Sequence, residues 1–134
     1  MVKECIGLTQ VDCTVDVYLN GPIFDTLSDD KYTLKRYGRD VDLVSELSGV
    51  VRGTPGEKII RSLPSFYSIS WEIKPGDFLP ATVDCFTRPG VAQLIGNSDE
   101  ECSRDVEIIH KLGSSGKFWQ IYSIIRNSNE WHLL

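Results

Sequence analysis

The 134-residue sequence lacks an apolar run of about 18 residues, the length that a membrane-spanning helix requires. Its first residues, 1–5 (MVKEC), do not lead into the long apolar core of a secretory signal, so we expect a chain that is not exported. The composition, 41% hydrophobic and 25% charged, excludes the disordered, collagen and coiled-coil classes. The length is that of one domain, and we predict a single domain over residues 1–134.

The sequence also lacks the residue spacings that metal binding and covalent catalysis require. Its four cysteines include no C-x-x-C pair, and its two histidines no H-x-x-x-H pair. Residues 113–117 (GSSGK) have two residues between the glycines, whereas a phosphate-binding loop has about four. No G-x-S-x-G motif accompanies His110 or His132. The sequence therefore predicts no catalytic, metal or cofactor site, and a protein that is not an enzyme.

The net charge of −5 at pH 7 argues against binding of nucleic acid or of an acidic membrane surface. Residues 31–61 nevertheless carry seven basic and four acidic side chains, a net +3, and the rest of the chain carries −8. Two interpretations stay open. The charges are either scattered over a solvated surface, or they form a basic patch that binds an acidic partner or supports head-to-tail self-association. The candidate contact residues are Lys35, Arg36, Arg39, Arg52, Lys58 and Arg61.

Apolar and polar residues alternate from Val11 to Asn20 with a period of two, which predicts a β-strand. Gly21-Pro22 ends this strand, and residues 21–38 have no sustained period, which predicts a long loop. Loops of this length in small domains are often functional. This loop is apolar enough to dock on the body or on another molecule, and its candidate contact residues are Ile23, Phe24, Leu27 and Tyr32.

Two helices are expected next. Asp40 is a suitable N-cap for a helix that ends at Gly53, and the apolar residues within it recur at helical spacing. Residues 54–57 (TPGE) match a capping box and predict a second, short helix that Pro64 ends. The pair has the outline of a helix–turn–helix, but its second helix is too apolar to read DNA, so we expect it to pack on a sheet.

A hairpin is predicted after these helices. Residues 67–73 alternate as a strand, residues 74–77 (KPGD) suit a type II turn, and residues 78–87 form the expected return strand. A short apolar strand follows at residues 91–95.

The last third of the sequence predicts a helix and a central strand. Ser98 and Glu101 form a capping box for a helix that ends at Gly113, although residues 106–112 can also be interpreted as a strand. Residues 117–126 are apolar on both faces, which is typical of a central strand. Together the elements predict an α+β fold, a single domain with a mostly antiparallel sheet and two to three helices packed on one face.

Three segments, in this order, resemble the folded core of rhabdovirus matrix proteins. Residues 11–17 (VDCTVDV) look like that family's early strand. Residues 40–45 (DVDLVS), which lead through a glycine to residues 58–60 (KII), are similar to its long helical region. Residues 114–119 (SSGKFW) resemble its C-terminal passage from helix to strand. The resemblance implies a non-enzymatic virion component that self-associates and bridges a nucleocapsid to the envelope, in the virion and the host cytoplasm.

The same resemblance implies roles for two segments. Residues 21–38 would be the arm that docks into a neighbouring copy, and residues 31–61 the contact with an acidic partner such as the nucleocapsid. Net acidity disfavours a membrane contact. Independently of the resemblance, the acidic surface outside residues 31–61 suits a small cytoplasmic binding module, such as an immunity protein that neutralises a basic toxin. An enzyme is the third interpretation.

Overall fold

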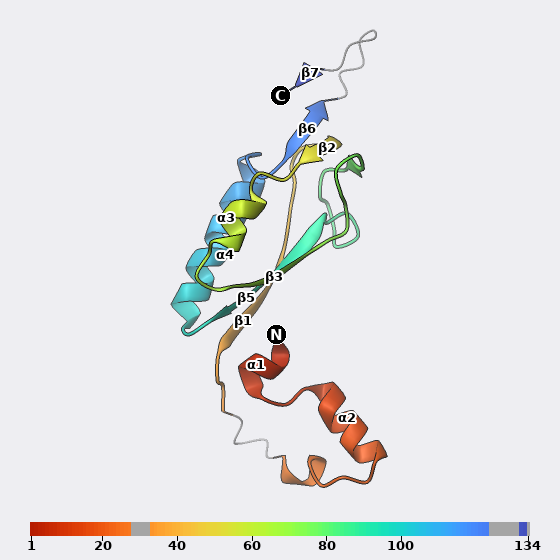
Figure 1. Ribbon diagram of the computed structural model, residues 1–134, viewed down its shortest axis with the longest axis vertical. Helices are drawn as coiled ribbons and strands as arrows, with labels where there is room; N and C mark the ends of the chain where they lie inside the picture. The colour runs from red at the N-terminus through yellow and green to blue at the C-terminus, as the bar shows by residue number, and fades with distance from the viewer. Residues whose placement is uncertain (28–32, 124–131, 134) are drawn as a thin grey trace.

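The computed structural model describes residues 1–27, 33–123 and 132–133 (Figure 1). Its mixture of helices and antiparallel sheets confirms the predicted α+β class. No helix in these described ranges is long and apolar enough to cross a membrane. The elements in chain order are α1 (Val2–Ile6), α2 (Gln10–Tyr18), the 3-10 turn η1 (Phe24–Thr26), β1 (Tyr37–Asp42), β2 (Gly49–Gly53), α3 (Glu57–Arg61), β3 (Phe66–Trp71), β4 (Phe78–Leu79), β5 (Gly90–Gly96), α4 (Asp99–Ser114), β6 (Gln120–Ser123) and β7 (His132–Leu133).

The strands form two antiparallel sheets. The first has the order β1-β5-β3, and its central strand β5 confirms the strand predicted at residues 91–95. The second has the order β4-β2-β6-β7 over the described residues. Strand β6 is internal to that sheet, as predicted, but it begins only at Gln120, because residues 117–119 form the turn after α4. Residues 124–126 of the predicted strand lie outside the described part of the chain.

Helix α4 covers one face of the first sheet, where it packs on β1 and β5 (Figure 1). Ser98 fixes its N-terminus, because the Ser98 Oγ accepts a hydrogen bond from the Glu101 backbone N–H at 3.1 Å. The apolar stripe of the helix buries Cys102, Ile109 and Leu112. These observations confirm the helix predicted from Ser98 to Gly113 over its alternative, a strand at residues 106–112.

A buried carboxylate joins α4 to the turn before β3. Asp105 is only 5% exposed, and its Oδ2 accepts hydrogen bonds from the Ser65 backbone N–H (3.0 Å) and from the Ser65 hydroxyl (2.6 Å). The Ser65 carbonyl in turn accepts the Ile95 N–H at 2.7 Å. Because buried polar groups are costly without partners, this network fixes the helix, the turn and strand β5 relative to one another.

Three aromatic side chains fill the other end of the core. The rings of Trp71, Phe118 and Trp119 lie 4.6 to 5.7 Å apart between centroids, in tilted or edge-on arrangements. The Trp119 Nε1–H donates to the Val44 carbonyl at 3.4 Å. This cluster packs with the apolar residues of both sheets, so the two sheets share one hydrophobic core.

The strand predicted at residues 11–20 is wrong, because this segment is helix α2. The Thr9 Oγ1 accepts the Asp12 N–H at 3.0 Å, and the Asp12 carboxylate accepts the Thr9 N–H at 2.9 Å. This capping box satisfies the first helical donors locally. The apolar residues at positions 11 and 15, and at 13 and 17, are four apart, so a period of two also produces two stripes along a helix.

The helix predicted from Asp40 to Gly53 is also wrong, because the segment forms β1, a connection and β2. Val41 and Leu43 are buried, whereas Asp40 and Asp42 are exposed, which is the alternation of a strand. Pairing with β5, far along the chain, stabilises this strand, and the local helical spacing gives no sign of it. The helix–turn–helix outline therefore does not form.

The hairpin prediction is correct for its first strand and its turn only. β3 is present, the Asp77 N–H donates to the Lys74 carbonyl at 3.0 Å, and Gly76 has a φ of 98°, as a type II turn requires. The return strand, however, is limited to β4, which pairs with β2 instead of β3. Pro80 follows β4 directly and has no N–H to donate, so residues 80–89 form a loop.

The second predicted helix exists as α3, but it has a single turn and begins at Glu57. Ile60 and Leu63 are buried beneath it, so it packs on the core as expected.

Candidate interaction site

The N-terminal part of the chain exposes its apolar residues instead of burying them. Helix α2 contains no buried residue, and in Figure 1 it lies at one end of the molecule, away from both sheets. Seven large apolar side chains of α2 and of the turn around η1 are between 48% and 83% exposed. We call them the α2–η1 surface, which consists of Val11, Val15, Val17, Tyr18, Leu19, Phe24 and Leu27.

Short-range hydrogen bonds hold this surface in shape. The Asp16 Oδ2 accepts the Ile23 N–H at 2.7 Å, and the Asp16 carbonyl accepts the Gly21 N–H at 2.8 Å, so η1 folds back toward α2. An open, mainly apolar groove of about 370 Å³ lies between them. Large apolar side chains exposed together on one short segment are typical of a site that contacts another macromolecule. The groove is lined by Gln10, Cys13, Thr14, Val17, Tyr18 and Phe24.

The predicted docking loop contributes part of this surface. Phe24 and Leu27 are exposed beside α2, Ile23 is half-buried, and Tyr32 lies outside the described residues. The sequence analysis missed the contribution of α2 because it assigned that segment to a strand. The signal that could have identified the helix is the pair Thr9 and Asp12, which has the spacing of a capping box.

The predicted basic contact residues are placed on several elements, and three of them are engaged by neighbours. Arg39 forms an ion pair with Asp99 at the start of α4. The Arg61 Nε donates to the Glu57 Oε1 at 2.7 Å. Arg52 lies 5.8 Å from the centroid of the Tyr122 ring. Local pairing of this kind favours the interpretation of scattered, solvated charges.

The remaining three basic residues lie on the coil before β1 and on α3. The Lys35 backbone N–H donates to the Cys5 carbonyl at 2.7 Å, which ties α1 to the chain before β1, while its side chain is exposed. Arg36 is half-buried, and Lys58 is exposed on α3. These positions do not single out one basic surface.

A second exposed apolar feature is the loop at residues 80–89. The Asp84 Oδ1 accepts the backbone N–H groups of Phe86 and Thr87, each at 3.0 Å, and the Thr82 N–H donates to the Ser45 carbonyl at 2.8 Å. The loop is thus fixed to the body, yet Phe86 is 89% exposed.

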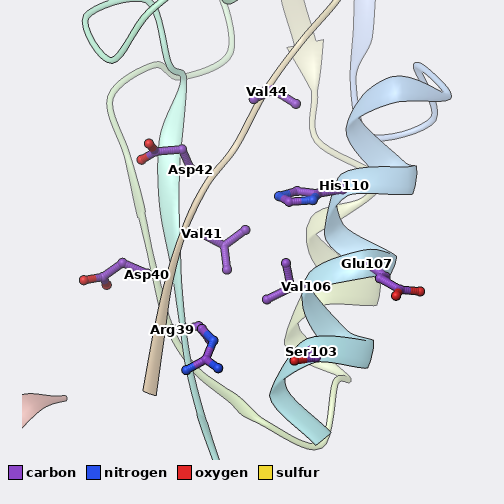
Figure 2. A pocket seen from close by; sticks show the side chains of 9 residues that line it. All are labelled: Arg39, Asp40, Val41, Asp42, Val44, Ser103, Val106, Glu107 and His110. Atoms are coloured by element: carbon purple, nitrogen blue, oxygen red, sulfur yellow. The ribbon is translucent and has the colours of Figure 1, made fainter. Parts of the chain in front are cut away.

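Figure 2 shows side chains that line a groove of mixed polar and apolar character between β1 and α4. The volume of this groove is about 560 Å³. Val41 and Val106 point toward each other across it, and His110 points from α4 toward the strand, while Asp40 and Asp42 point away from the helix. Within the described residues, no hydrogen bond or ion pair joins His110 to another side chain. The groove therefore offers surface for a ligand but no paired acid and base.

The cysteines do not form a reactive cluster. All four are free; Cys5 and Cys102 are buried, and Cys85 is exposed. Burial raises the pKa of the Cys102 thiol, which keeps it protonated. Over residues 1–27 and 33–123, no group of three or more histidine, cysteine or carboxylate side chains could hold a metal ion.

Sequence comparisons assign the chain to no family, because no family model and no curated protein matches it. Its fold, however, is similar to parts of two solved structures. An L-amino acid ligase from Bacillus licheniformis superposes with a TM-score of 0.65 at 14% identity, over 99% of this chain and 29% of the ligase chain. A phosphoribosylglycinamide synthetase from Anaerococcus prevotii superposes with a TM-score of 0.57 at 11% identity, over 82% of this chain and 28% of the synthetase chain.

At these identities the likeness shows a shared fold and nothing of shared chemistry. The chain spans less than a third of the length of either enzyme. In both, the same fold occurs as one portion of a much larger polypeptide.

Proposed function

We propose that this chain is a non-catalytic domain that completes a larger, ligase-type enzyme, and that it docks on the larger part through the α2–η1 surface. The observation that carries the proposal is the match of 99% of this chain to 29% of an L-amino acid ligase. The matched enzyme chain is more than three times as long as this one, so in that enzyme the matched portion belongs to a chain with a much larger remainder.

The composition of the α2–η1 surface supports packing on protein. Its exposed side chains are aliphatic and aromatic, the types that supply the central contacts of protein interfaces. The two carboxylates on α2 are already engaged within the segment, Asp12 by Thr9 and Lys3, and Asp16 by Ile23. A partner therefore does not have to supply positive charge for these two carboxylates. An apolar face on the larger part of the enzyme is the surface that would complement the exposed side chains.

The charged residues support a role in binding over one in chemistry. Arg39 and Arg61 form ion pairs with the neighbouring carboxylates of Asp99 and Glu57. The His110 imidazole, in the groove of Figure 2, has no acid or base partner among the described residues. In a ligase of this kind, activation of the substrates would then depend on residues of the larger part.

The viral matrix-like role and the immunity-protein role stay predictions. Two of the three segments that carry the resemblance to rhabdovirus matrix proteins differ in secondary structure from the expectation, since residues 11–17 are helical and residues 40–45 begin in a strand. The third, residues 114–119, does pass from a helix to a strand. Self-association through the α2–η1 surface is the outcome that would favour the matrix-like role.

The test is to isolate the protein from its natural source with an affinity tag and to measure its intact mass under native conditions. We expect it within, or bound to, a much larger polypeptide. The isolated assembly should release phosphate from a nucleoside triphosphate when L-amino acids are supplied, and the 134-residue chain alone should not.

Two variants locate the contact. Val15→Glu places a charge on the α2–η1 surface and should weaken the association at least about tenfold, with a parallel loss of ligase activity. Ile108→Glu, on the exposed face of α4, is the control and should leave both unchanged. Recovery of the chain only as a monomer, or only with copies of itself, would contradict the proposal.

A further inference from the structure

Strand β1 has an unpaired edge in the first sheet. It pairs with β5 on one side, and no strand lies on its other side within the described residues. The Leu43 N–H donates to the Gly90 carbonyl at 2.9 Å, in the same register that pairs Val41 with Ala92. In an antiparallel ladder every second residue bonds to the partner strand, and the residues between them direct their N–H and C=O groups away from it. The backbone groups of Asp40 and Asp42 therefore face the free edge.

The free edge borders the groove of Figure 2. The Gly38 carbonyl at its beginning is occupied, because it accepts a hydrogen bond from the Arg39 guanidinium at 3.0 Å. Beyond that point, Val41 from the strand and Val106 and His110 from α4 point into the groove. The groove thus combines unpaired ladder groups along one side with partly apolar side chains along the other.

We propose that this edge binds an extended peptide segment of a partner protein, which adds to the sheet as a strand beside β1. Strand addition takes its affinity from main-chain hydrogen bonds and its specificity from the side chains that alternate between the two faces. Here one face is the groove, which suits β-branched apolar side chains. This site does not include the α2–η1 surface, so it does not depend on the function proposed above.

The other face of the edge selects basic side chains. Asp40 and Asp42 point away from α4 and are exposed (Figure 2). The Asp42 carboxylate is paired with Arg88 at 2.7 Å, but Asp40 has only the neutral Gln93 amide, at 2.9 Å, as a described side-chain partner. Opposite charges across adjacent strands are stabilising. The segment that fits best therefore alternates β-branched residues with lysine or arginine.

The probe is a capped heptapeptide that alternates lysine and valine. Titration into the 134-residue chain should protect the Asp40 and Asp42 amides from hydrogen exchange. Two further peptides carry N-methyl groups on every valine or on every lysine. Since the amides of an extended strand alternate between its two edges, only one of these peptides should lose binding. A peptide with glutamate in place of lysine should bind more weakly.

Variants of the protein provide the complementary test. Asp40→Pro removes one outward N–H, at an edge position where proline is tolerated, and should weaken binding about tenfold. Asp40→Ala keeps the N–H and should weaken binding by a smaller factor that disappears at high salt. Equal binding of all four peptides, protection away from β1, unchanged affinity of Asp40→Pro, or no binding at roughly 1 mM peptide would overturn the proposal.

Discussion

The segment from α1 to η1 and the body that begins at β1 use apolar residues in opposite ways. In the body, β-strands and α4 bury their apolar side chains around one core, in which Ile60, Leu79 and Leu94 are fully buried. In α2 the aliphatic side chains face solvent, and the helix is maintained by its own capping box. An isolated helix of nine residues is marginal in water, so packing is the normal source of helical stability. The difference indicates that the body folds as a unit, and it is the reason we propose that α2 packs on a partner.

The same contrast separates two kinds of surface. The β1 edge offers unpaired backbone groups and carboxylates, which suit an extended basic segment. The α2–η1 surface offers mainly apolar side-chain area, which suits a preformed apolar face. A single chain with both surfaces could bind two different partners at once.

The largest expected effect lies in the body and compares two neighbours on α3. Ile60 is fully buried and Ile59 is 44% exposed. Ile60→Ala should lower the free energy of unfolding by about 2–5 kcal/mol, because it removes buried methyl groups and leaves a cavity. Ile59→Ala should change it by less than about 1 kcal/mol. Urea unfolding followed by tryptophan fluorescence measures both, and equal losses would show that α3 does not pack as described.

An intermediate effect is expected at the polar contact between α4 and the turn before β3. Asp105→Ala leaves the buried Ser65 N–H and hydroxyl without their acceptor, and should cost about 1–3 kcal/mol. Ser65→Ala removes only the hydroxyl and should cost less, since the backbone hydrogen bond to Asp105 remains. The same urea titration compares the two variants. A larger loss for Ser65→Ala would contradict the assigned role of the carboxylate.

Elements whose signals are local were predicted correctly from the sequence. The Ser98 cap and the stripe that follows it specify α4, and Pro75-Gly76 specifies a turn that requires a positive φ. The errors arise where one hydrophobic pattern fits both a strand and a helix, as in α2, or where pairing with a strand far along the chain determines the secondary structure. Residues 41–51 have helical spacing, but Val41 pairs with Ala92, and this partner cannot be seen in a local window.

The candidate sites were predicted only in part, for a related reason. Phe24 and Leu27 were identified by their apolar character within a loop, but the larger share of the α2–η1 surface depends on the helical assignment of α2. The β1 edge could not be predicted at all, because an edge exists only once the order of the strands is known.

The smallest effect is expected in α2, where the helix depends on Thr9. Hydrogen bonds from the Thr9 backbone and side chain lower the pKa of Asp12 below its usual value. A carboxyl group with a lowered pKa in the folded state stabilises that state above its unfolded pKa, and the contribution is lost as the pH falls through the folded pKa. The protection of the α2 amides, measured as their exchange rate relative to the intrinsic rate at the same pH, should therefore fall below about pH 4, while the protection of the β5 amides stays high. Thr9→Ala should weaken α2 by about 1 kcal/mol at neutral pH and flatten this pH dependence. If the protection of β5 changed together with that of α2, the two regions would unfold as one unit, and the contrast between them would not hold.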